Sequence, residues 1–285
     1  STWNLQRRLN RNLRPPIATT DPAYPAAFPN SGVPVFASFP TRRIDPTINW
    51  ISVNESSAHS DYNALTVSVT RRLAKRFTVS ANYTFARNRD DDSNERNFDR
   101  EPTLNPYDLK AEAGYSKQDV RHNLNVSGVF DLGYGFTLSG IVITRSGFPY
   151  TALMGDDFNG DGNEDNDRAI IDGKVVGRHT LRQPKFFNLD LRLLKTFNFT
   201  EKYRLAFSAE VFNATKASNK GFGPDAVSEV CTDVAAFFGA NPSGLAITCP
   251  SGFSPSRFAG DAFTAPSSAR FGGPRQMQLG VRFSF

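Results

Sequence analysis

The stretch that decides the fold is the last ten residues, Gln276-Met-Gln-Leu-Gly-Val-Arg-Phe-Ser-Phe285. Every second side chain in it is apolar: Met277, Leu279, Val281, Phe283 and Phe285. This period of two is typical of a β-strand with one apolar face. The alternation reaches the last residue, whereas a soluble domain usually ends in a polar, frayed tail. The stretch therefore predicts either a membrane β-barrel strand, whose apolar face meets lipid, or a β-sandwich strand, whose apolar face covers a core.

The same alternation recurs in other parts of the chain, and each repeat is long enough to cross a bilayer at a tilt. These stretches are residues 62–73, 77–87, 120–131, 136–145, 185–198 and 203–212. Residues 3–13 and 47–53 show weaker versions of the pattern, whereas residues 15–46 are rich in proline and predict an extended loop. Together the pattern predicts about eight or nine strands.

The lengths of the connections separate the two fold classes. Short turns are expected at 74–76, 132–135 and 199–202, and long insertions at 88–117, 146–184 and 213–275, in strict alternation. Up-and-down membrane barrels have short periplasmic turns and long extracellular loops, whereas a soluble barrel or sandwich has no reason for this asymmetry. We therefore predict an all-β fold, an antiparallel up-and-down transmembrane β-barrel segment in the bacterial outer membrane.

Composition agrees with this class and excludes others. The chain has 285 residues, a net charge of +5 and a mean hydropathy of −0.41, and no apolar run reaches the ~18 residues of a membrane helix. Low hydropathy is compatible with a membrane barrel because half of each strand is polar. No nucleic-acid-binding motif accompanies the basic residues, so we expect no nucleic-acid partner.

Several motifs in this order resemble TonB-dependent receptors, especially the Oar-like group. They are residues 61–73 and 77–87, Gln118-Asp-Val-Arg-His-Asn-Leu124, Arg145-Ser-Gly-Phe-Pro-Tyr150, Glu210-Val-Phe-Asn-Ala-Thr215 and residues 274–285. The resemblance implies a barrel of about 22 strands around a plug domain. It also implies a segment that contacts the TonB system, and energised import of a bulky extracellular ligand.

The chain departs from this family pattern, because neither a plug domain nor a TonB-contacting segment is visible in it. We expect residues 1–285 to be a partial barrel domain, with 1–46 partly irregular and 47–285 carrying the regular strands. Its expected partners are outer-membrane lipid, the remainder of the receptor barrel and plug, and an unknown ligand. The alternatives are a small self-contained outer-membrane barrel acting as an adhesin or structural protein, and a soluble β-sandwich that binds carbohydrate.

One acidic stretch, residues 156–167, has the spacing of a calcium-binding loop. Oxygen-bearing side chains recur at alternate positions: Asp157, Asn159, Asp161 and Asp165. Gly162 occupies the sixth place, where such loops turn sharply, but Arg168 stands where a bidentate glutamate is usual. The stretch therefore predicts either a weak Ca²⁺ site or a solvated acidic turn.

The remaining chemistry-bearing residues predict no enzyme. The three histidines, His59, His122 and His179, lack metal-ligand spacing, and no nucleophile, phosphate-binding or metalloprotease motif is present. Cys231 and Cys249 are the only two cysteines, and we predict a disulfide between them because the compartment of assembly is oxidising.

Overall fold

A computed structural model of the chain describes most residues up to 219 and the last strand. The described residues are 2–17, 32–37, 40–72, 76–93, 103–154, 157, 159–163, 165–219, 228–229, 231–232, 254–255 and 274–285. In this part of the chain, no helix has the length and apolar character of a membrane span.

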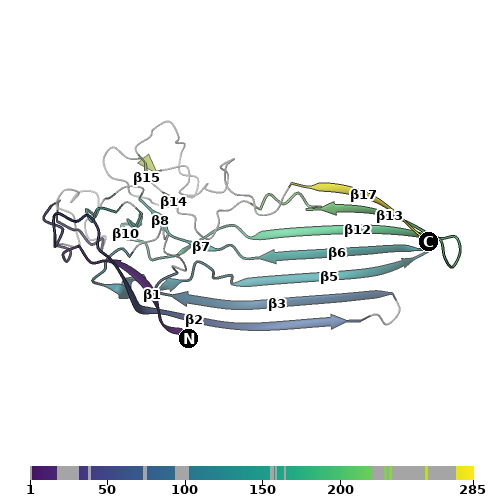
Figure 1. Cartoon of the computed structure of the whole chain (residues 1–285), viewed down its shortest axis with the longest axis horizontal. Helices are drawn as coiled ribbons and strands as arrows, with labels where there is room; N and C mark the ends of the chain where they lie inside the picture. Colours follow the sequence, from purple (N-terminus) through teal and green to yellow (C-terminus); the bar gives the residue numbers. More distant parts are fainter. Residues whose placement is uncertain are drawn as a thin grey trace.

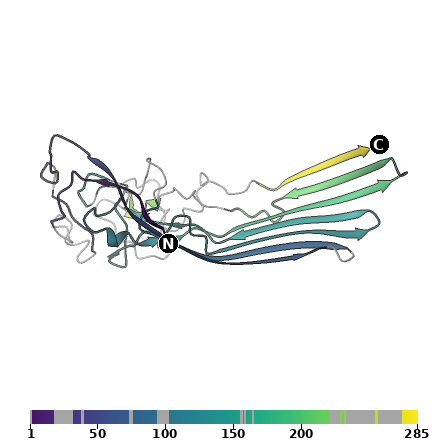
Figure 2. The ribbon, with the colours of Figure 1, turned by 60° about the horizontal axis from the view of Figure 1, so that its bottom comes forward.

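The described strands form one large antiparallel sheet. Eight of them follow each other in the order β1-β2-β3-β5-β6-β12-β13-β17, and a ninth short strand, β4, pairs with the end of β3. Their bounds are β1 Thr2–Asn10, β2 Ser52–Arg71, β3 Phe77–Asp90, β4 Gly114–Tyr115, β5 His122–Gly133, β6 Phe136–Arg145, β12 Phe186–Asn198, β13 Arg204–Phe212 and β17 Gln276–Ser284. The strands lie side by side in Figure 1, and the turned view in Figure 2 shows them as a single curved layer.

The register places the apolar side chains of neighbouring strands in continuous rows on one face of the sheet, the apolar face. Val67 pairs with Tyr83, which pairs with Leu124, and Ala209 pairs with Leu279. Leu279 is 82% exposed, and the remaining described strands form only two-stranded pieces, so no second described sheet covers the apolar face. This arrangement contradicts the β-sandwich alternative, which requires that face to be buried against a second sheet.

The opposite, polar face carries mostly hydroxyl, amide and charged side chains. The Thr66 and Thr84 hydroxyl oxygens lie 3.2 Å apart, and Arg192 Nε lies 3.1 Å from Glu210 Oε1. Ile141 also belongs to this face, because its cross-strand partners are Ser127 and Asp190.

The two ends of the sheet differ in the way that the sequence predicts. At the turn end, Gly133-Tyr134-Gly135 joins β5 to β6, and all three residues have positive φ angles. A Cβ on Gly135 would lie 2.4 Å from the Thr196 carbonyl oxygen, so only glycine fits there. Figure 1 shows the C-terminus at this end and the long connections gathered at the other, the loop end.

Aromatic rings line the apolar face near the turn end. Phe77 and Phe130 have centroids 5.9 Å apart, and Tyr203 stacks on Phe283 at 6.1 Å. Lys195 Nζ lies 4.1 Å from the centroid of the Phe136 ring and donates to the Tyr134 carbonyl. Rings at this height match the aromatic girdle of membrane barrels, and Lys195 extends toward the polar edge as predicted for a snorkelling lysine.

The structure differs from the prediction in the position of one strand, and it places short elements of secondary structure in the predicted insertions. Residues 47–51 are outside any strand, and β2 instead continues from Ser52 through the predicted 62–73 segment. The first half of β2 is polar and becomes a strand because β1 pairs with residues 52–60.

The described parts of the insertions contain one short helix and several two-stranded pieces. Their bounds are η1 Leu109–Glu112, β7 Pro149–Tyr150 with β11 Leu181–Arg182, β9 Ile170–Ile171 with β10 Lys174–Val175, β8 Ala152–Leu153 with β14 Ser228–Glu229, and β15 Cys231–Thr232 with β16 Ser254–Pro255. The pair β15–β16 belongs to the third predicted insertion, 213–275, and the pair β8–β14 joins the second insertion, 146–184, to the third.

The sheet does not close on itself. Among the described strands, β1 and β17 do not pair with each other, and each occupies one end of the strand order. Because β1 covers only residues 52–60 of β2, residues 61–71 have no described strand on that side.

Candidate functional site

The loop end carries a folded layer with its own core, which we call the loop layer. It comprises β1 and residues 11–17, the first half of β2, the end of β3 and the described parts of residues 32–50, 91–119 and 146–185. Apolar side chains that are almost fully buried gather here: Leu9, Leu13, Val35, Phe36, Leu104, Tyr150, Leu153, Met154 and Ile170. This apolar core gives the loop layer a source of stability that a solvated loop lacks.

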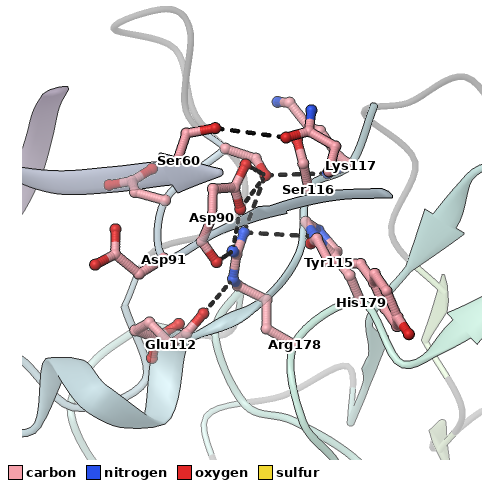
Figure 3. A network of polar contacts seen from close by, with 12 residues as sticks. Ser60, Asp90, Asp91, Glu112, Tyr115, Ser116, Lys117, Arg178 and His179 are labelled. Atoms are coloured by element: carbon pink, nitrogen blue, oxygen red, sulfur yellow. Dashed lines mark hydrogen bonds and ion pairs between the residues drawn. The ribbon is translucent and has the colours of Figure 1, made fainter. Parts of the chain in front are cut away.

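Arg178 is the centre of a buried polar network in this layer (Figure 3). Its guanidinium forms an ion pair with Asp90 and donates to the Ser93 hydroxyl at 3.0 Å and to the Glu112 carbonyl at 2.7 Å. The Ser93 hydroxyl in turn donates to both Asp90 carboxylate oxygens, at 2.7 and 2.9 Å. The network therefore joins the end of β3 to the last residue of η1 and to residue 178.

Two further buried pairs extend this network. Arg168 forms an ion pair with Glu112, and its other guanidinium nitrogen donates to the Ala111 carbonyl at 3.3 Å. His179, which has no exposed surface, donates from Nδ1 to the Tyr115 carbonyl at 2.6 Å. Each buried charge in these contacts has a partner of opposite charge, which offsets the cost of removing it from water.

A separate cluster fixes β1 to the end of β3. Arg7, which is 1% exposed, lies 2.7 Å from an Asp91 carboxylate oxygen and 3.6 Å from Asp92. Asp91 also accepts from the His59 backbone at 2.7 Å. Burial acts to raise the pKa of Asp91, but the hydrogen bonds from His59 and the charge of Arg7 outweigh it, so its pKa is lowered.

The predicted calcium loop folds as a series of side-chain-to-backbone turns. Asp157 accepts from the Gly162 amide at 2.8 Å, Asn159 from the Asp161 amide at 2.8 Å, and Asp161 from the Asn163 amide at 2.7 Å. Gly162 has a φ of +90°, which glycine adopts without strain. These contacts bring three of the four predicted ligand residues around one turn, whereas Asp165 is exposed.

A cation from elsewhere in the chain faces this turn. Arg42 donates to the Gly160 carbonyl at 2.9 Å and lies 3.7 Å from an Asp157 carboxylate oxygen. A Cβ on Gly162 would lie 2.7 Å from the Arg42 guanidinium, so the glycine also makes room for it. Within the described ranges, no group of three or more histidine, cysteine or acidic side chains is arranged to hold a metal ion. The weak calcium site stays a prediction.

Asp161 is a carboxyl group of this turn whose pKa differs from its ordinary value. Burial raises its pKa from 3.8 to about 7, and the neighbouring Asp157 charge adds to the effect. The Asn166 amide, which donates to Asp161 at 2.6 Å, and Arg42 act in the opposite direction. The Asp161 carboxyl group is therefore harder to ionise than an exposed aspartate.

The other predicted site lies outside the described residues. Cys231 belongs to β15, but its side chain and the whole of Cys249 are not described, so their disulfide stays a prediction. By contrast, the sequence interpretation missed the buried arginines Arg7, Arg168 and Arg178. No local pattern marks them, because their acidic partners are 56 to 88 residues away in the chain.

A single-layer antiparallel sheet with an exposed apolar face, girdle aromatics and long connections at one end defines the class of outer-membrane β-barrel proteins. Residues 2–175 match the family described as outer membrane beta barrel domain. The match covers more than half of the chain, so the chain belongs to this family and is located in the bacterial outer membrane. No curated protein and no solved structure matches it. The apolar face is therefore the lipid-facing surface, and the loop layer lies on the extracellular side.

Proposed function

We propose that the chain is part of the barrel of a TonB-dependent outer-membrane receptor or transporter. Its role is non-enzymatic: it contributes to the wall and extracellular loops through which a ligand is bound or imported. The ordered series of motifs from residue 61 to residue 285 supports this receptor type. The observation that carries the proposal is the open sheet.

An open edge is unstable at membrane depth because lipid cannot hydrogen-bond the free backbone groups. The edge formed by residues 61–71 of β2 and the outer edge of β17 both carry lipid-facing apolar side chains, such as Leu65 and Leu279. Both edges therefore need partner strands. Strands from the remainder of a larger receptor barrel would pair with both edges and leave the register of the described strands unchanged.

The polar face also suits a barrel that encloses a plug domain. Ile141, which is 47% exposed, and the 44% exposed Val129 are diagonal neighbours on it, among Ser127, Ser139 and Arg192. An open water channel gives two apolar side chains no partner, whereas a plug packed against the wall covers them. The hydroxyl and amide groups around them would then bind the polar surface of the plug.

The test compares this chain alone with the protein in its native membrane. We expect the isolated chain, refolded in detergent, to give no heat-modifiable, protease-resistant barrel, because the two edges of the described sheet have no described partner strands. In cells, we expect ligand uptake to stop when the inner-membrane proton gradient is collapsed. A heat-modifiable barrel formed by this chain alone would replace the proposal with the self-contained adhesin or structural barrel.

A further inference from the structure

Four arginines gather on the extracellular rim of the lipid-facing surface, around the ring of Tyr115. The guanidinium carbons of Arg182, Arg121 and Arg89 lie 4.9, 5.3 and 5.8 Å from its centroid. Arg87 is two residues before Arg89 on the same strand. The hydrogen bond from Arg121 and the charges of Arg87 and Arg182 lower the pKa of Tyr115, although partial burial opposes them.

The register fixes the height and the direction of this cluster. Arg87 and Arg89 continue the row that contains Phe85, so they point to the lipid-facing side, and both are exposed. Immediately below them, the Phe85 ring lies 5.2 Å from the His122 ring, which shares a 2.8 Å hydrogen bond with Tyr83. Amphipathic rings of this kind sit at the headgroup level of a membrane. The arginines thus lie level with the headgroups of the outer leaflet.

The cluster has more positive than negative charge. Asp119 is fully buried, forms an ion pair with Arg182 and lies 3.9 Å from Arg121. Asp61 is the cross-strand neighbour of Arg89. Among the described residues, four guanidinium groups thus face two carboxylates, and no ion pair there joins Arg87 or Arg89 to an acidic side chain.

We propose that Arg87, Arg89, Arg121 and Arg182 form a binding site for the phosphate groups of a phosphorylated glycolipid in the outer leaflet. A guanidinium group binds phosphate through two parallel hydrogen bonds, and several together hold a multiply charged headgroup. Asp119 fixes Arg182 and Arg121 in place, while Arg87 and Arg89 reach the headgroup from the exposed end of β3. The acyl chains of the same lipid would cover the apolar side chains below.

The experiment uses the protein purified from outer membranes and placed in phosphatidylcholine nanodiscs, titrated with diphosphoryl lipid A and with the same lipid after its phosphates are removed. We expect at least tenfold weaker binding of the dephosphorylated lipid. The double variant Arg87→Gln/Arg89→Gln should show a similar loss for diphosphoryl lipid A. Arg71→Gln is the matched control, because Arg71 is an exposed arginine of the same face at the turn end, 4.5 Å from the Phe77 ring centroid. Its binding should match that of the unaltered chain.

Further measurements distinguish binding of the lipid phosphate from binding of free phosphate, and they test whether a variant has misfolded. Millimolar inorganic phosphate should not displace the lipid, and Arg87→Lys/Arg89→Lys, which keeps both charges, should retain most binding. Protein purified from outer membranes should carry less phosphorylated glycolipid, by mass spectrometry, when it has the glutamine variant. Equal binding of the two lipid forms, equal losses in the double variant and in Arg71→Gln, or displacement by inorganic phosphate would each overturn the proposal.

Discussion

The strand layer, which is the large sheet outside the loop layer, and the loop layer distribute polarity in opposite ways. In the strand layer, Met277 and Leu279 are 76% and 82% exposed, whereas in the loop layer Arg7 and His179 are 1% and 0% exposed. Lipid makes the first arrangement favourable, since an apolar side chain facing acyl chains avoids water. The buried charges of the loop layer are stable because each buried arginine lies beside a carboxylate. The strand layer therefore depends on the lipid around it, whereas the loop layer depends on the ion pairs inside it.

The largest effect is expected when the central ion pair of the loop layer, between Arg178 and Asp90, is removed. Arg178→Met would leave the Asp90 carboxylate buried without its main partner, and we expect a loss of about 3–5 kcal/mol in the free energy of opening this layer. Native-state hydrogen exchange of the loop-layer amides measures it. Lys174→Met is the control, because Lys174 is an exposed basic residue of the same layer. Recovery in Arg178→Met/Asp90→Leu would identify the unpaired charge as the cause, and an unaltered exchange rate in the single variant would contradict it.

The strand layer is tested by placing one charge on each of its faces. Leu279→Arg puts a cation among acyl chains and should cost roughly 2–4 kcal/mol if residue 279 lies near the bilayer midplane. Gln278→Arg puts the same cation on the polar face and should cost little. Denaturant unfolding of the lipid-reconstituted protein compares the two variants. If Gln278→Arg were the more damaging change, the assignment of the faces would be reversed.

A smaller, local effect follows from the titration of Asp161. Its pKa is about 7 in the folded loop and near 3.8 when unfolded, so the folded loop binds an extra proton between these values. The contribution of Asp161 to the stability of the loop is therefore greatest below about pH 4, falls as the pH rises to about 7 and then levels off. Protease nicking of the loop should be faster at pH 8 than at pH 5. Asp161→Asn should remove this difference, whereas Asp165→Asn, at an exposed position, should leave it unchanged.

The smallest expected effect is the response of the acidic turn to calcium. Arg168 replaces the usual bidentate ligand and is already paired with Glu112, so we expect a dissociation constant of only ~10⁻⁴–10⁻³ M. Isothermal titration calorimetry measures it, and Asp161→Ala should abolish the signal. Micromolar affinity, or binding that survives Asp161→Ala, would contradict the prediction.

Most of the strand layer could be predicted from the sequence, because a period of two reports directly which side chains share a face. The ten residues from Gln276 and the segments 62–73 and 77–87 gave their faces correctly in this way. The pattern failed where a strand is polar on both faces. Residues 52–60 form the first half of β2 only because β1 pairs with them.

The sequence by itself therefore determined the outer-membrane class, the lipid-facing side chains and the turn and loop ends of the sheet. It did so because the faces depend on neighbours two residues apart, and the two ends depend on the lengths of the connections. Only the tertiary structure decided that the loops form a layer with buried ion pairs, that Arg42 faces the acidic turn, and that four arginines surround Tyr115. Such contacts join residues far apart in the chain, and a local pattern holds no information about which distant charge will offset the cost of burial.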